Sequence, residues 1–234
     1  KVALSCSDTK EDLKGCPFEA RMGTGNLSQA GCTATLQSIT SSTKGPGAKA
    51  AAFGACAAMA GEEITAIVEA RDRYGNSTQF SGESVVVSAY GPAHMPAERN
   101  FEVADIRSGR MALRAIFPRA GSYTVSVTVD GIPIATSPLV LHVFPGSCET
   151  SRAVLRGDAL NGIIASKITK LLVQTEDKYG NNCHVGGDRV NLSMQGPNGI
   201  KVNALDVKDN EDGTYSFAFI VPQAGRWTIQ AIVN

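Results

Sequence analysis

Aromatic residues are scarce in this chain and its net charge is zero. Phe, Trp and Tyr make up 6% of the 234 residues, with a single Trp, whereas Val, Ile, Thr, Ser, Ala and Gly are frequent, which favours short strands and glycine turns. The 22 basic and 22 acidic residues cancel, so no global field indicates nucleic acid or an anionic membrane as a partner. No apolar run approaches the roughly 18 residues of a membrane span. We therefore expect no direct membrane insertion.

Motifs of catalysis and metal binding are also missing from the sequence. The three histidines, His94, His142 and His184, stand far apart, and only Cys183 lies near one of them at a spacing suited to metal ligands. No Gly-x-Ser-x-Gly, P-loop or paired-carboxylate arrangement is present. The sequence therefore predicts a protein that is not an enzyme and that carries no cofactor and no metal.

One pattern occurs twice in the chain at the spacing of a whole domain. Asp72-Arg-Tyr-Gly-Asn76 recurs 105 positions later as Asp177-Lys-Tyr-Gly-Asn181, and Gly91-Pro92 recurs at the same distance as Gly196-Pro197. This period is typical of an immunoglobulin-like sandwich and too long for a solenoid unit. A calcium site at the two Asp turns is an alternative, but turn geometry suffices to explain them, because Asp caps its own turn while Gly and Asn tolerate positive φ.

Alternating apolar residues predict the strands of two sandwiches. The clearest alternation, Tyr123–Val129, precedes the hairpin turn Asp130-Gly131. The second copy has no counterpart of Pro138–Val143 before the sequence stops, so we expect it to lack its last strand, through truncation or because a strand is supplied in trans.

The predicted fold class is all-β, with two tandem immunoglobulin-like sandwiches after an irregular N-terminal segment that contains cysteines. The expected domains are 1–46 for this disulfide-tied segment or remnant of a preceding domain, 47–146 for the first repeat and 147–234 for the incomplete second repeat.

Six cysteines and three glycosylation sequons together favour an extracellular setting. We predict a Cys148–Cys183 disulfide, since both residues fall at the same end of the second sandwich and a bridge closing about 36 residues is geometrically allowed. The remaining cysteines would pair among themselves, with Cys6–Cys16 and Cys32–Cys56 as the first expectation. The sequons predict glycans on Asn26, Asn76 and Asn191. A cytosolic protein with free buried thiols is the alternative.

The two copies resemble filamin-type immunoglobulin repeats. That family's pattern runs from an Asp-x-x-Gly-Asn turn to a strand ending in Gly-Pro, then Asp-Gly-Thr-Tyr, Pro-x-x-x-Gly-x-Tyr-x-Val and Ser-Pro-Phe-x-Val-x-Val. The matching segments are Asp72–Asn76, Gly91-Pro92, Pro118–Val127 and Ser137–Val143 in the first copy, and Asp177–Asn181, Gly196-Pro197, Asp212–Tyr215 and Pro222–Ile229 in the second. The first copy departs from the pattern at Ser108-Gly-Arg-Met111, where the family has Asp-Gly-Thr-Tyr.

The resemblance implies that partners add a strand beside the strand that ends in Gly-Pro. The outward-facing residues of this strand in the first copy, which we take as the candidate partner-binding set, are Ser84, Val86, Ser88 and Tyr90. In the second copy Asn191 occupies the position of Val86, and a glycan there would obstruct strand addition. We therefore expect the first edge to be open and the second to be shielded.

The predicted function is that of an extracellular cell–cell adhesion or recognition fragment. Filamin-type repeats also occur at plant and algal gamete surfaces, so the resemblance implies attachment before gamete fusion as its specific form. The tandem domains would act as spacer and binding surface for a protein partner, such as a cell-surface receptor, in the ectodomain of a membrane-anchored protein. The alternative is an intracellular filamin-like scaffold, cytoskeletal or flagellar, that binds partners by strand addition.

Overall fold

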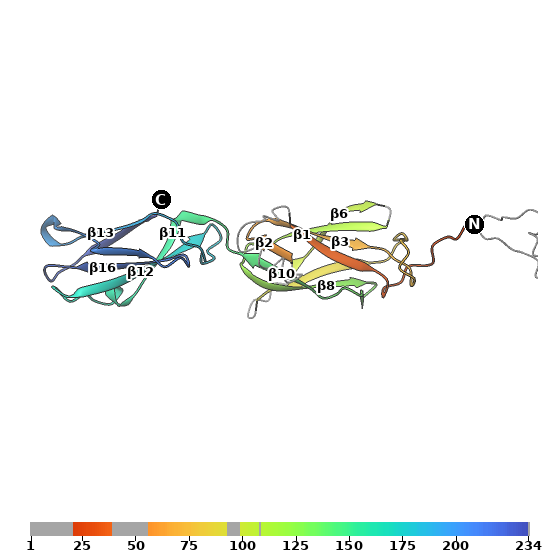
Figure 1. Cartoon of the computed structure of the whole chain (residues 1–234), viewed down its shortest axis with the longest axis horizontal. Coiled ribbons are helices and arrows are strands. Elements are labelled where there is room, and N and C mark those ends of the chain that lie inside the picture. Colours follow the sequence, from red (N-terminus) through yellow and green to blue (C-terminus); the bar gives the residue numbers. More distant parts are fainter. Residues whose placement is uncertain (1–20, 39–55, 93–98, 108, 234) are drawn as a thin grey trace, which may run out of the picture.

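The chain folds into two β-sandwiches that lie end to end along its length (Figure 1). The computed structural model describes residues 21–38, 56–92, 99–107 and 109–233. Within these residues the only helical segments are two short 3-10 turns, η1 (Asp158–Leu160) and η2 (Pro197–Gly199). The expected all-β class with tandem immunoglobulin-like sandwiches is thus confirmed.

The first sandwich consists of two facing sheets. One sheet has the order β1-β3-β7-β6 and the other the order β2-β10-β8-β4-β5, with β9 paired to β8. Neighbouring strands run antiparallel, except that β2 and β10 are parallel. The strands are β1 (Thr33–Ser38), β2 (Cys56–Met59), β3 (Glu63–Glu69), β4 (Val85–Tyr90), β5 (Arg99–Asn100), β6 (Glu102–Arg107), β7 (Arg110–Ile116), β8 (Gly121–Val129), β9 (Ile132–Pro133) and β10 (Leu139–Phe144).

The second sandwich repeats this plan with fewer strands. One sheet has the order β11-β12-β16-β15 and the other the order β14-β13-β17. Among the residues that the structure describes, β17 pairs only with β13, whereas its counterpart β8 pairs with β4 and β10. The strands are β11 (Cys148–Arg156), β12 (Ile168–Asp177), β13 (Val190–Gln195), β14 (Lys201–Asn203), β15 (Asp206–Asp209), β16 (Thr214–Ile220) and β17 (Thr228–Val233).

Each sandwich has its own core, built by strand alternation. In β3 every second side chain is buried, as in Ile64, Ala66 and Val68, and β8 buries Val125 and Val127 from the facing sheet. The second core has the same construction and centres on the aromatic side chains of β16, Tyr215, Phe217 and Phe219. Two separate cores indicate two domains that meet only at their ends.

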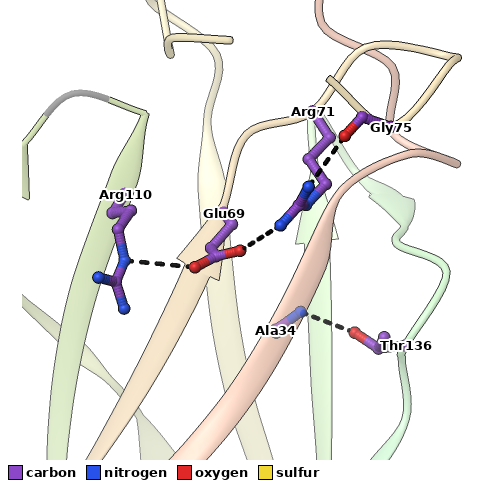
Figure 2. A network of polar contacts seen from close by, with 6 residues as sticks. All are labelled: Ala34, Glu69, Arg71, Gly75, Arg110 and Thr136. Carbon is purple, nitrogen blue, oxygen red and sulfur yellow. Dashed lines mark hydrogen bonds and ion pairs between the residues drawn. The ribbon is translucent and has the colours of Figure 1, made fainter. Parts of the chain in front are cut away.

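The N-terminal segment contributes to the first sandwich, which the sequence did not indicate. Strand β1, which falls inside the expected irregular stretch 1–46, pairs with β3 along its whole length, from Thr33 opposite Glu69 to Ser38 opposite Ile64. The amide of Ala34 also donates a 2.8 Å hydrogen bond to Thr136 Oγ1 in the segment before β10 (Figure 2). The N-terminal segment, through β1, therefore supplies one edge of the first sheet.

Candidate functional site

The predicted partner-binding strand is β4, and its side chains are open only in part. Val86 and Tyr90 are 46% and 52% exposed, and Ser84 is also exposed. Ser88 was expected to point outward with them, but it is 7% exposed. The open surface of this face is therefore divided between the two ends of the strand.

The backbone edge of β4 is also covered over part of its length. Strand β5 pairs with it at Ser88 and Ala89, and the amide of Phe101 donates to the carbonyl of Val87 at 3.0 Å. In the second sandwich β14 pairs with β13 in the same way, and the exposed Asn191 lies on β13 opposite Ile232. Each backbone edge is therefore paired over part of its length, and shielding of the second edge by a glycan on Asn191 stays a prediction.

The second Asp turn has a complete set of internal hydrogen bonds. Asp177 is buried, and its Oδ1 accepts the amides of Tyr179 and Asn181, both at 2.9 Å. Its Oδ2 accepts Asn181 Nδ2 and the amide of Gly146 in the interdomain linker, both at 2.8 Å. Burial raises the pKa of this carboxyl, but the hydrogen bonds from Asn181, Gly146 and Tyr179 outweigh burial and lower the pKa below its ordinary value.

The same turn is bonded directly to the first sandwich. Asn181 Nδ2 donates to the carbonyl of Pro118 at 2.8 Å, and Asn181 Oδ1 accepts the amide of Ala120 at 2.9 Å. Both groups of Asn181 thus serve the junction, and the residue is 8% exposed. One side chain therefore joins the turn of the second domain to the Pro118–Gly121 turn of the first.

Tyr179 and Gly61 form the apolar part of this junction. Tyr179 packs against the core of the first sandwich. A Cβ atom on Gly61 would lie 2.1 Å from the Tyr179 hydroxyl, so only glycine leaves room for the ring. Gly61 also has a φ of +84°, which glycine adopts without strain. The fit between the domains depends on this position.

Two cavities flank the junction. One, of about 440 Å³, is lined by linker residues and by Cys148, Cys183 and Asp188. The other, of about 430 Å³, is lined by Arg119, His184 and the pair Ser122 and His142, whose Oγ and Nδ1 are 2.8 Å apart. Across the described ranges, no three His, Cys, Asp or Glu side chains are placed to hold a metal ion.

The cysteines that the structure describes are free thiols. Cys148 and Cys183 line the same cavity, and burial raises the pKa of both thiols, that of Cys148 to about 12. Cys32 is buried on one side of the first sandwich, with Sγ 4.0 Å from the carbonyl of Arg71, while Cys56 begins β2 in the other sheet. The predicted partners Cys6 and Cys16 lie outside the described residues, and the disulfides remain predictions.

The three sequon asparagines are accessible. The side chains of Asn26, Asn76 and Asn191 are all exposed. Asn76 also donates from Nδ2 to Asp72 Oδ2 at 3.0 Å. Glycosylation stays a prediction at each of them. In the described part of the chain no helix is long and apolar enough to cross a membrane.

Comparison with known proteins identifies the repeat. The Filamin/ABP280 repeat profile matches residues 147–234. Filamin-A of Drosophila melanogaster is 26% identical over 110 residues, and filamin-C of Mus musculus is 28% identical over 130 residues, which are 47% and 55% of this chain. The chain carries filamin-type immunoglobulin-like repeats. The aligned part is 4% of the length of each of these filamins.

Solved structures of low sequence identity show similar sandwiches. The Escherichia coli adhesin FdeC gives a TM-score of 0.46 at 20% identity, with 90% of this chain and 62% of that chain covered. The Lin-41 filamin domain gives a TM-score of 0.35 at 18% identity, with 52% of this chain and 100% of that chain covered. Neither likeness bears on partners.

The sequence did not reveal which filamin-type repeat residues form the junction. Tyr and Asn occupy the same places in both Asp turns, at Tyr74 and Asn76 as at Tyr179 and Asn181. Among the residues that the structure describes, only the second turn faces another domain. The one signal available in the sequence was the glycine at position 61, and its role at the junction can be recognised only once the Tyr179 ring is placed beside it.

Proposed function

We propose that this chain is a stiff, protein-binding segment of an adhesion or scaffold protein and that it has no enzymatic activity. The observation that carries the proposal is the junction, in which the Asp177–Asn181 turn is bonded to the first sandwich and to the linker. A hydrogen bond of this kind contributes about 1 kcal/mol net. Several of them, with the Tyr179 contact, oppose bending between the domains.

The linker itself supports the stiffness. It consists of Pro145, Gly146 and Ser147 between β10 and β11, and Gly146 is held by Asp177. Linkers this short permit little independent motion when their ends are packed. Tandem repeats of this kind suit a spacer that presents binding surfaces at a fixed separation.

The candidate binding surface for a protein partner is the β4 face of the first sandwich. Val86 and Tyr90 are large and exposed there, and exposed aromatic and aliphatic side chains are typical anchors of protein interfaces. Since β5 covers part of the edge, binding to side chains is favoured over complete strand addition.

For the cellular setting we propose the extracellular surface, with a cell-surface receptor as partner and gamete attachment as the specific form. The exposure of all three sequon asparagines and the position of Cys148 and Cys183 in the lining of one cavity support it. The intracellular scaffold is the second candidate, favoured by the similarity to filamins.

Two experiments test these proposals. Residual dipolar couplings of the full chain should fit one alignment tensor for both sandwiches, and two tensors of different magnitude would refute a stiff spacer. On protein from its natural source, glycosidase treatment and alkylation with and without reductant should both shift the mass. Unglycosylated protein with six free thiols would support the scaffold instead.

A further inference from the structure

The first Asp turn is built like the one at the junction. Asp72 Oδ1 accepts the amides of Tyr74 and Asn76, both at 2.9 Å, and Oδ2 accepts Asn76 Nδ2 at 3.0 Å. A cation stacks on each tyrosine, Arg73 on Tyr74 at 4.5 Å and Lys178 on Tyr179 at 4.9 Å. The two turns therefore present the same groups in the same arrangement.

The chain also enters both turns along the same path. The amide of Gly25 donates to Asp72 Oδ2 at 2.9 Å, as that of Gly146 does to Asp177 Oδ2. Leu27 is bridged to Asp72 as Cys148 is paired with Asp177. The side chain of Thr78 donates to the carbonyl of Gly25 at 3.3 Å, and Cys183 Sγ lies 3.9 Å from that of Gly146. Gly25 thus has the role of a linker residue.

The two turns differ in what covers them. Tyr179 packs on the core of the first sandwich, whereas Tyr74 is 71% exposed. Asn181 uses both its side-chain oxygen and its side-chain nitrogen in hydrogen bonds to the first sandwich. Within the described residues, the side chain of Asn76 has Asp72 as its partner. The Tyr74–Asn76 surface is an uncovered copy of an interface that the molecule uses elsewhere.

This surface is held in place without a partner domain. Arg71 donates to the carbonyl of Gly75 at 2.9 Å and pairs with Glu69 at 2.8 Å, and Arg110 lies 3.3 Å from the other oxygen of Glu69 (Figure 2). Arg71 and Glu69 are about two-thirds buried, and such partly buried, linked pairs hold geometry better than isolated surface pairs. The turn is preorganised for docking.

We propose that Tyr74–Asn76 is the docking surface for another filamin-type sandwich, one that precedes this domain in the full-length protein, with Gly25 in the place that Gly146 has at the existing junction. Its docking end would carry a turn of the Pro-x-Ala-Gly kind, as Pro118–Gly121 does, to offer a carbonyl and an amide to Asn76. It would also have glycine at the place of Gly61, to receive the Tyr74 ring. The proposal extends the spacer role, on which it rests, to one more junction.

A second copy of this chain fits the surface less well. The far end of its second sandwich keeps the Pro222-Gln-Ala-Gly225 turn. The position that corresponds to Gly61 is Ser166, whose amide donates to Val221 as that of Gly61 donates to Phe117, both at 2.8 Å, and whose φ is +63°. Its Cβ would stand where the Tyr74 hydroxyl needs to lie. We expect no head-to-tail chains of copies through this surface.

The test is a three-sandwich chain that reuses the existing junction. Residues 21–145 are joined directly to Gly25 of the full chain, so that the linker spacing at the new junction equals that before Gly146. A fluorinated tyrosine at position 74 of the original first sandwich reports on docking by ¹⁹F NMR. The matched control carries Gly61→Ser in the added sandwich, which copies the side chain of Ser166.

Docking predicts that the Tyr74 resonance moves on extension and returns to its original position in the Gly61→Ser control. A resonance that stays unchanged on extension, or that moves equally in the control, would overturn the proposal. Cooperative thermal unfolding of the added sandwich shows that each version is folded. Dipolar couplings on the unextended chain test the existing junction separately, so failure of the spacer proposal is distinguishable. A glycan on Asn76 would block this surface, so docking requires Asn76 to be unmodified, and the protein is prepared without glycosylation.

Discussion

Replacing Gly61 by Ala should undock the two sandwiches while leaving each one folded. The added Cβ would lie 2.1 Å from the Tyr179 hydroxyl and 2.4 and 2.5 Å from two ring carbons, and Gly61 is held at a φ of +84°. Because real Cβ contacts do not fall below about 3.0 Å, the ring has to leave its place against the first core. The substitution therefore acts on the junction through one named contact.

The size of the effect follows from the contacts that the ring supports. An aromatic side chain buries some 150–250 Å² when fully covered, so loss of about half of this area costs about 2–3 kcal/mol at roughly 25 cal/mol per Å². If the two Asn181 bonds to Ala120 and Pro118 open with it, about 1 kcal/mol each is added. A loss of about 4 kcal/mol shifts the docking equilibrium by roughly three orders of magnitude.

Backbone strain needs its own control, because alanine at positive φ costs about 1 kcal/mol wherever it occurs. Gly75 provides it, since its φ is +82° and no atom lies within 4 Å of a Cβ placed there. Gly75→Ala should lower the stability of the first sandwich by about the same strain and leave the junction intact. Tyr179→Ala should make Gly61→Ala nearly silent for docking, as expected of two residues in contact.

The assay is the pair of alignment tensors from residual dipolar couplings, together with hydrogen exchange of the Ala120 amide, which Asn181 protects. Gly61→Ala should give two tensors of different magnitude and faster exchange at Ala120. A single shared tensor and unchanged exchange in Gly61→Ala would refute the role assigned to the Gly61–Tyr179 contact.

Three further changes test other parts of the structure. Asn181→Ala removes two interdomain hydrogen bonds and should weaken docking by about 1–3 kcal/mol, whereas Asn76→Ala should leave the dipolar couplings of the second sandwich unchanged; equal effects would contradict the assignment. The pKa of Asp72 is lowered to about 2 by hydrogen bonds, first from the Asn76 side chain and then from Gly25, so the unfolded chain, with a pKa near 3.9, takes up the proton at higher pH. Stability from this carboxylate is present above about pH 4 and lost as the pH falls toward 2. In a plot of the urea unfolding midpoint against pH, Asp72→Asn should therefore flatten the slope between about pH 4 and about pH 2. An unchanged slope would contradict this role. Val86→Lys should weaken binding to partner cells about tenfold or more in a surface-binding assay if the β4 face is the interface, and unchanged binding would place the interface elsewhere.

The repeat and its turns were predictable from sequence because their causes are local. An Asp that caps its own turn, followed by Gly and Asn, has the same hydrogen bonds at Asp72 and Asp177, and strand alternation places the core residues of β3 and β8 without knowledge of the fold. Strand β1 was missed because its pairing is distant: Leu36 meets Ala66 only after the stretch 39–55. In the second repeat the equivalent strand, β11, begins just after the linker, so its position could be predicted from the end of the preceding repeat. The first repeat lacks such a marker before β1.

The junction lies beyond local sequence reasoning for a different reason. Tyr74 and Tyr179 stand in turns of the same sequence pattern and the same internal hydrogen bonds, yet one is exposed and the other is packed. The difference is in what faces each ring: Gly61 of the first sandwich leaves space for Tyr179, whereas within the described residues no sandwich faces Tyr74. At this junction, docking therefore depends on the receiving residue Gly61 as well as on the turn. For other tandem repeats of this kind, we expect a stiff junction where glycine stands at the place of Gly61 and leaves room for the ring.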